Sequence, residues 1–159
     1  MAVTLAPVAR GEYDAFFATV REYLREMNTY DPHAADDPFD VDRYEAAVRA
    51  EIAAQEASEE RELLWILDGR ERAGFAIVRT LPDWPDDSRM VASIAEFYVA
   101  PAFRRRGVGS AAVEALLAEH RRRGTYEVEA GILRDNHPAR AFWERMGFEL
   151  RSYQTARRP

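Results

Sequence analysis

Apolar residues recur at two different spacings along this chain, and the spacing predicts where its helices and strands lie. Between residues 13 and 27 the apolar positions fall three or four apart, as they do on the buried face of a helix. These positions are Phe16, Phe17, Val20, Tyr23, Leu24 and Met27. A short strand is expected before this helix at 3–5, and a second helix is expected after it at 42–57.

Three largely apolar stretches occupy the middle of the chain and predict buried strands. The runs are 63–67, 74–78 and 91–99. Asp68-Gly69 follows the first run and is typical of a tight hairpin turn into the second. Pro101 ends the third run, because proline has no N–H group to donate to a neighbouring strand.

The last third of the chain alternates helices with strands. Residues 110–123 predict a helix, and Gly124 stands where a left-handed cap would end it. A strand is expected at 126–132 and a helix at 138–147, and residues 148–150 are expected to open a last strand.

The resulting order is strand, two helices, three strands, helix, strand, helix and strand, which indicates a mixed α/β fold. Because a strand–helix–strand step brings the chain back in the same direction, at least one pair of strands is expected to be parallel. The chain has 159 residues, and no repeat or low-complexity linker divides it. We therefore expect residues 1–159 to form a single domain.

Composition and charge argue against several classes of function. The chain has no cysteine, which removes thiol nucleophiles and cysteine zinc sites, and its 3 histidines are too widely spaced to suggest a metal motif. A net charge of −6 argues against a nucleic-acid partner. With no secretory signal and no apolar run long enough to span a bilayer, we expect a cytoplasmic protein with no membrane partner.

A glycine-bearing turn joins the strand at 91–99 to the helix at 110–123 and has the chemistry of a phosphate site. The first N–H groups of a helix lack partners within the helix and lie at the positive end of its dipole, so they can bind a pyrophosphate. Glycines let phosphate oxygens approach the backbone, and arginines add charge-assisted contacts. A dinucleotide fingerprint would need glycine at Ala112, and the chain has no G-K-[S/T] for an ATP-binding loop.

The same turn resembles the signature of the GNAT superfamily of acetyl-CoA-dependent acyltransferases. That signature is Q/R-x-x-G-x-G/A, which Arg104, Gly107 and Gly109 match. The superfamily also has a hydrophobic strand ending in a V-x-P-like run, which 99–101 matches here. The resemblance therefore includes the strand before the turn as well as the turn itself.

A second GNAT motif, N-x-x-A-x-x-F-Y-x-x-x-G-F, lies downstream. It begins at Asn136 and ends at Phe148, and every position matches except Trp143, which replaces the tyrosine. Together the two motifs cover about residues 91–150. The first 60 residues match the superfamily only in their strand–helix–helix outline.

The resemblance implies a mixed sheet of six or seven strands with helices on both faces. The fourth and fifth strands would splay apart, and the pantetheine arm of acetyl-CoA would lie between them. Phe97 and Val99 would contact it through backbone groups, and residues 105–110 would surround the pyrophosphate. The residues that would bind acetyl-CoA are Phe97, Val99, Arg104, Arg105, Arg106, Gly107, Val108, Gly109, Ser110 and Asn136. No metal is implied.

Acetyl transfer to an amine requires a base that removes the amine proton. Glu96 is the candidate, because it lies in the apolar strand 91–99 and burial raises the pKa of a carboxyl toward the working range. Glu129 on the next strand is its rival. The structural alternative for Glu96 is an exposed or arginine-paired side chain.

The departing thiolate benefits from a proton, which a tyrosine at the position of Trp143 supplies in many relatives. An indole N–H is only a hydrogen-bond donor and has negligible acidity. Tyr98 is the catalytic candidate here, because strand alternation places it on the same face as Glu96. Core packing is the alternative role for Trp143, and His137 beside Pro138 is expected to cap a helix.

Together these features predict an N-acetyltransferase that moves an acetyl group from acetyl-CoA to a primary amine by direct attack. The acceptor would be a small molecule or a protein, and a homodimer is a possible assembly because many relatives pair. The alternative is a non-catalytic module that binds or senses acyl-CoA, which the missing tyrosine favours. A nucleic-acid contact through the arginines at 104–106 and 121–123 is disfavoured by the net charge.

The resemblance implies that substrate choice depends on the first 60 residues, where it is usually decided in the superfamily. The acidic loop 31–42 would attract a cationic amine, although ordinary loop solvation also explains it. Candidates for lining an acceptor pocket are Tyr23, Glu26, Tyr30 and Trp84. Ordinary packing explains these four equally well.

Overall fold

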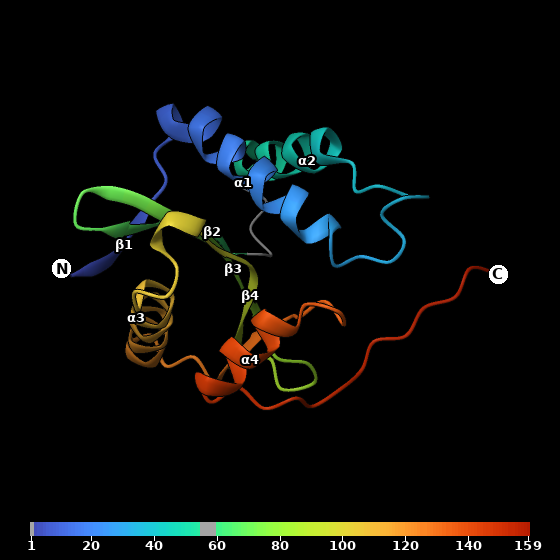
Figure 1. The fold of residues 1–159 in the computed structure, drawn as a ribbon. Coiled ribbons are helices and arrows are strands. Elements are labelled where there is room, and N and C mark those ends of the chain that lie inside the picture. Colours follow the sequence, from blue (N-terminus) through green and yellow to red (C-terminus); the bar gives the residue numbers. More distant parts are fainter. Residues whose placement is uncertain (1, 55–59) are drawn as a thin grey trace.

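The computed structural model describes residues 2–54 and 60–159, which fold around one five-stranded sheet (Figure 1). The strands are β1 (Val3–Pro7), β2 (Glu60–Asp68), β3 (Glu71–Pro82), β4 (Met90–Val99) and β5 (Glu127–Ala130). The helices are α1 (Tyr13–Asn28), α2 (Val41–Ala54), α3 (Val108–Arg122) and α4 (His137–Arg145). Short 3-10 turns, η1 (Arg10–Glu12) and η2 (Pro101–Phe103), precede α1 and follow β4.

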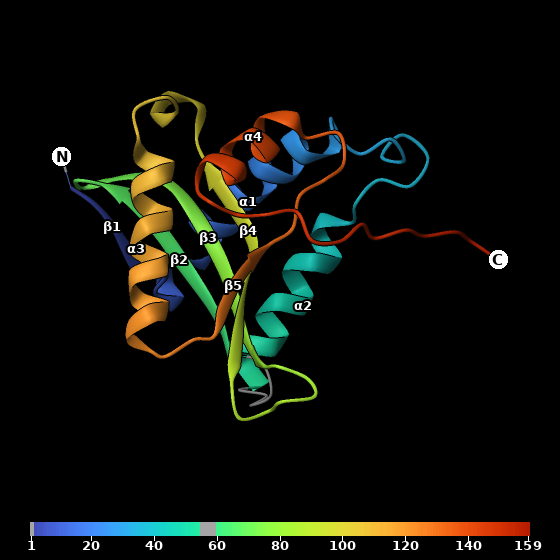
Figure 2. The same ribbon diagram turned by 90° about the horizontal axis from the view of Figure 1, so that it is seen from below.

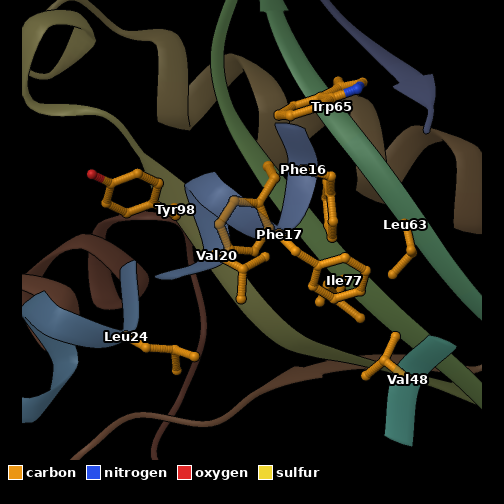
Figure 3. Close-up of a cluster of buried hydrophobic side chains, with 10 residues drawn as sticks. Phe16, Phe17, Val20, Leu24, Val48, Leu63, Trp65, Ile77 and Tyr98 are labelled. Carbon is orange, nitrogen blue, oxygen red and sulfur yellow. The ribbon is translucent and has the colours of Figure 1, made fainter. Parts of the chain in front are cut away.

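Strand alternation divides the apolar residues between two layers. One layer packs α1 and α2 against one face of the sheet, and Figure 3 shows part of it. Its buried residues are Phe16, Phe17, Val20, Leu24, Val48, Leu63, Trp65, Phe75, Ile77 and Tyr98. The other layer packs α3 and α4 against the opposite face, through residues such as Ala76, Ile94, Val113 and Trp143. Figures 1 and 2 show the two pairs of helices on opposite sides of the sheet.

The strands follow one another in sequence order across the sheet, β1-β2-β3-β4-β5. The first four are antiparallel neighbours, and Gly69, with φ 65°, turns β2 back into β3 as the hairpin signal predicted. The connection through α3 makes β4 and β5 parallel, which confirms the expected parallel pair. Gly124, with φ 73°, follows α3 as a left-handed residue, as predicted.

The parallel pairing is short, because β4 meets β5 only from Val91 opposite Glu127 to Ile94 opposite Ala130. β4 continues to Val99 beyond that point, still paired with β3 on its other edge. The expected separation of the fourth and fifth strands is therefore present at the C-terminal end of β4.

Three expectations about the elements need correction. The sheet has five strands within the described residues, where six or seven were expected, and β5 is shorter than 126–132. The strand expected at 148–150 is not formed. The Phe148 N–H donates to the Trp143 carbonyl at 3.0 Å and its ring packs on the Trp143 ring, so the chain turns back over α4 instead of pairing with β5. Residues 55–57 of the second expected helix lie outside the described residues.

Gly74 on β3 lies too close to the backbone of β4 to accept a side chain. A Cβ at this position would overlap the carbonyl oxygen of Tyr98 and lie 3.0 Å from the Cα of Val99. We predict that Gly74→Ala lowers the free energy of unfolding by about 2 kcal/mol or more, because two backbones must move apart. Gly11→Ala is the matched control, since nothing lies within 4 Å of a Cβ there. Urea unfolding measures both variants, and equal stabilities for the two would contradict the prediction.

Candidate active site

The turn between β4 and α3 is built around Gly107. This residue precedes the first residue of α3 and has φ 79°, a left-handed conformation that glycine adopts without strain. No side chain caps the helix there, and nothing lies within 4 Å of a Cβ at Gly107. The first N–H groups of α3 therefore have no side-chain cap and lie at the positive end of the helix dipole.

The Arg104 guanidinium already has hydrogen-bond partners within the protein. Its Nε donates to the carbonyl of Val99 at 2.7 Å, and its guanidinium pairs with Glu26 of α1 at 2.6 Å. The guanidinium also lies 5.5 Å from the centre of the Tyr98 ring. The signature arginine thus ties the turn to the end of β4 and to α1, and its pairing with Glu26 was not predicted.

The other residues of the turn divide between the solvent and the core. Arg105 is exposed and has a left-handed φ of 62°, and Arg106 is exposed with Asp68 at 3.7 Å. Val108 is buried. A Cβ at Gly109 would lie 3.4 Å from the Phe142 ring, so a small residue there keeps α3 close to α4.

A pocket opens where β5 no longer pairs with β4, and about 430 Å³ of empty space lies within it and its mouth. Most of the lining residues have apolar side chains, and Tyr23 and Asn136 add polar ones. The lining residues are Tyr23, Met27, Ile94, Ala95, Phe97, Gly131, Ile132, Leu133, Asn136, Ala139 and Trp143. The wall therefore comes from α1, β4, α4 and the segment that follows β5.

The backbone of β4 offers polar groups along this gap. The Ala100 N–H donates to Ala73 of β3 at 2.8 Å, so the groups of Tyr98 also face β3. The N–H and C=O groups of Phe97 and Val99 therefore point to the other edge of β4, which no longer pairs with β5 at these residues. The Val99 carbonyl accepts the bond from Arg104, which leaves the Val99 N–H and both groups of Phe97 directed into the gap.

A β-bulge at Ala95 decides where Glu96 points. Ile94 pairs with Val78 and Glu96 pairs with Ile77, so Ala95 is an extra residue in β4. Ile94 packs in the α3–α4 layer, and without the extra residue strand alternation would send Glu96 to that same side. The bulge turns Glu96 to the α1 side, where Tyr98 packs as well. Sequence analysis placed these two residues on one face but did not detect the bulge.

Glu96 is largely buried and accepts a hydrogen bond from the hydroxyl of Tyr23 on α1. Burial raises the pKa of Glu96, and the Tyr23 bond and the positive charge of Arg61 offset part of that rise. Neither Glu96 nor its rival Glu129, which is exposed on β5, is among the residues that line the pocket. Glu96 is joined to the pocket wall by its hydrogen bond with Tyr23, which makes it the better candidate of the two carboxylates for proton transfer.

Asn136 is the cap of α4, a role that sequence analysis gave to His137. The Asn136 side-chain oxygen accepts from the Ala139 N–H at 3.1 Å, while His137 is the first residue of the helix. The Asn136 amide nitrogen is directed to the sulfur of Met27, 3.8 Å away. Sulfur is a weak acceptor, so this nitrogen keeps most of its capacity to donate into the pocket.

The aromatic candidates lie in three different places. Trp143 is buried in the pocket wall against Phe97, with ring centres 5.4 Å apart. Tyr98 is also buried, but it does not line the pocket, and burial together with the charge of Glu26 raises the pKa of its hydroxyl. Trp84 is 89% exposed in the β3–β4 loop, before β4 begins, and is not a pocket residue.

Comparison with known sequences assigns the chain to a family. The sequence model of the acetyltransferase (GNAT) family matches residues 19–148. The chain belongs to this family. An uncharacterised N-acetyltransferase of Methanocaldococcus jannaschii is 38% identical over 63 residues, which are 40% of this chain and 28% of that protein. The match therefore covers less than a third of the relative's length.

Solved structures share the GNAT fold across the whole chain. A candidate acetyltransferase from Bacillus subtilis is 16% identical with a TM-score of 0.72, and the match covers 99% of both chains. A ribosomal-protein-alanine N-acetyltransferase from Brucella melitensis is 18% identical with a TM-score of 0.70, again over 99% of both chains. A soil-metagenome aminoglycoside acetyltransferase is 14% identical with a TM-score of 0.68, over 99% of this chain and 96% of that one.

Two further features bear on the site. Among residues 2–54 and 60–159, no group of three histidine, aspartate or glutamate side chains is arranged to hold a metal ion. None of the helices in that part of the chain is both long and apolar enough to cross a membrane.

The burial of Glu96 predicts a pH-dependent cost to stability. Its folded pKa is raised, so below the unfolded pKa of about 4.3 the carboxyl is neutral in both states and burial costs little. As the pH rises through the folded pKa, the buried charge destabilises the protein. We predict that Glu96→Gln, whose amide oxygen still accepts from Tyr23, is more stable than the wild type at pH 7 and similar to it near pH 4. Urea unfolding at both pH values measures this, and a variant less stable at pH 7 would contradict it.

Proposed function

We propose that this GNAT protein transfers an acetyl group from acetyl-CoA to a primary amine by direct attack, with Glu96 as the general base. The observation that carries the proposal is the position of Glu96. The bulge at Ala95 turns this largely buried carboxylate toward Tyr23, a residue that lines the pocket beside β4. A proton acceptor would thereby lie behind the pocket wall, one hydrogen bond away from the lining residue Tyr23.

The turn before α3 supports binding of the pyrophosphate of acetyl-CoA. Gly107 leaves open space in front of uncapped helical N–H groups, and Arg105 and Arg106 add positive charge at the surface nearby. Arg104 contributes by holding the turn against β4, since its guanidinium already bonds Val99 and Glu26.

The gap beside β4 supports binding of the pantetheine arm. Its apolar side chains suit the carbon chain of the arm, and the backbone groups of Phe97 and the amide of Asn136 suit the arm's two amide bonds. The Val99 N–H faces the same gap and would donate to the oxygen of the acetyl carbonyl as negative charge develops on it.

In the proposed reaction Glu96 takes a proton from the acceptor amine, and the neutral amine attacks the thioester carbonyl. The carbon–nitrogen bond forms, the carbon–sulfur bond breaks, and the thiolate of CoA leaves and takes the second proton that the nitrogen loses as the amide forms. Trp143 cannot protonate that thiolate, and the raised pKa of the buried Tyr98 makes it a poor acid, so no protein acid is assigned to this step. No covalent intermediate on the protein is needed, consistent with a chain that lacks cysteine.

The acceptor is proposed to be an amine on a small molecule or on a protein terminus. The names of two fold relatives include one acceptor of each kind, an aminoglycoside and a ribosomal-protein alanine. A second candidate function, binding of acyl-CoA without turnover, is favoured by the buried Trp143 in place of the usual tyrosine. Turnover with any amine separates the two.

Calorimetric titration with acetyl-CoA tests the cofactor site. We predict that the wild type binds and that Gly107→Glu does not, because the new carboxylate stands where the pyrophosphate would lie. Gly124→Glu is the matched control at the other end of α3, with φ 73° and nothing within 4 Å of a Cβ. The two variants carry the same charge change and a similar backbone strain. Binding by the folded Gly107 variant, or no binding by the wild type, would contradict the proposal.

A further inference from the structure

The Glu96 carboxylate has one hydrogen-bond partner in the described part of the chain, the hydroxyl of Tyr23, which donates to its Oε2. We propose that Tyr23 is a positioning residue for the base: it fixes the Glu96 carboxylate through Oε2 and leaves Oε1 to take the proton of the acceptor amine. This inference rests on the proposed role of Glu96.

Packing fixes the Tyr23 ring. It meets Phe75 edge-on, with ring centres 5.6 Å apart and an interplanar angle of 90°, and it meets Tyr98 at 5.8 Å and 61°. Such contacts stabilise aromatic pairs and restrict the ring to one orientation. The carboxylate is therefore held by a rigid group on α1, and the same tyrosine lines the pocket.

Tyr23 acts only as a donor in this arrangement. Burial raises the pKa of its hydroxyl, and the negative charge of Glu96 raises it further, so the proton stays on Tyr23 at every working pH. A donor to a carboxylate stabilises the charged form and lowers the pKa of that carboxyl. Tyr23 thus partly reverses the effect of burial and keeps Glu96 deprotonated closer to neutral pH.

Other ionisable groups face this pair from neighbouring elements. Arg61 of β2 lowers the pKa of Glu96 through its charge, and it is ion-paired with Glu51 of α2 at 2.8 Å. The remaining groups that interact electrostatically with the pair or with its neighbour Tyr44 are Tyr44, Glu26 and Arg79. Replacing Tyr23 by phenylalanine leaves every one of these groups in place.

The test is the pH dependence of kcat/KM for acetyl transfer in Tyr23→Phe. The acceptor is the best of a panel comprising a polyamine, an aminoglycoside and a peptide with a free α-amino group. We expect the acid limb of the profile to move up by about one pH unit, because a bond to a charged group is lost. The rate should fall about tenfold below the limb and return to within about twofold of the wild type well above it.

Tyr13→Phe is the matched control: it makes the same change on the same helix, where the ring packs on Phe17 away from Glu96. Carbon-13 NMR titration of the Glu96 carboxyl adds a readout that needs no turnover, and its pKa should rise by the same amount in Tyr23→Phe. A rate lowered equally at every pH, or an unmoved limb and pKa, would overturn the inference. Undiminished turnover by Glu96→Gln, or no turnover with any acceptor, would instead contradict the proposed function.

Discussion

The parallel pairing of β4 with β5 ends at Ile94, while β4 itself runs on to Val99. A strand edge without a neighbour leaves backbone N–H and C=O groups that need partners. In this protein those groups line a pocket closed by α1, α4 and the segment after β5. The apolar wall, the helix terminus at Gly107 and the buried carboxylate are arranged around that open edge.

The bulge at Ala95, next to this open edge, orients the proposed base Glu96. A single extra residue reverses the facing of everything after it, so Ile94 packs under α3 and α4 while Glu96 lies under α1. The Glu96 carboxylate lies at the edge of the aromatic layer that includes Phe75 and Tyr98. A buried charge there destabilises the fold, a cost that the proposed role of Glu96 as a base would explain.

The order of elements and the hairpin at Gly69 could be predicted, because hydrophobic spacing and turn residues are local properties of the sequence. The turn at Gly107 could also be located, since it depends on a short motif between a strand and a helix. The absence of a strand at 148–150 could not be predicted, because Phe148 folds back onto Trp143 through a contact that strand propensity does not describe.

The site could be predicted only in part, because some of its contacts join residues that lie far apart in the sequence. Glu96 could be selected because it is a charged residue in an apolar strand. Its hydrogen bond to Tyr23, and the pairing of Arg104 with Glu26, join positions more than 70 residues apart and arise only when α1 packs on β4. The bulge that orients Glu96 has no glycine or other marker in 91–99.

The most direct measurement compares thiol release from acetyl-CoA by the wild type and by Glu96→Gln in the presence of a primary amine, with acetyl-CoA affinity measured on the same samples. Loss of a general base should slow transfer by about 10²–10⁴-fold while the affinity stays within about twofold. That pattern would establish an acetyltransferase whose base lies at the β4 bulge. Equal rates for the two proteins would contradict the account, because the position of Glu96 would then have no part in the reaction.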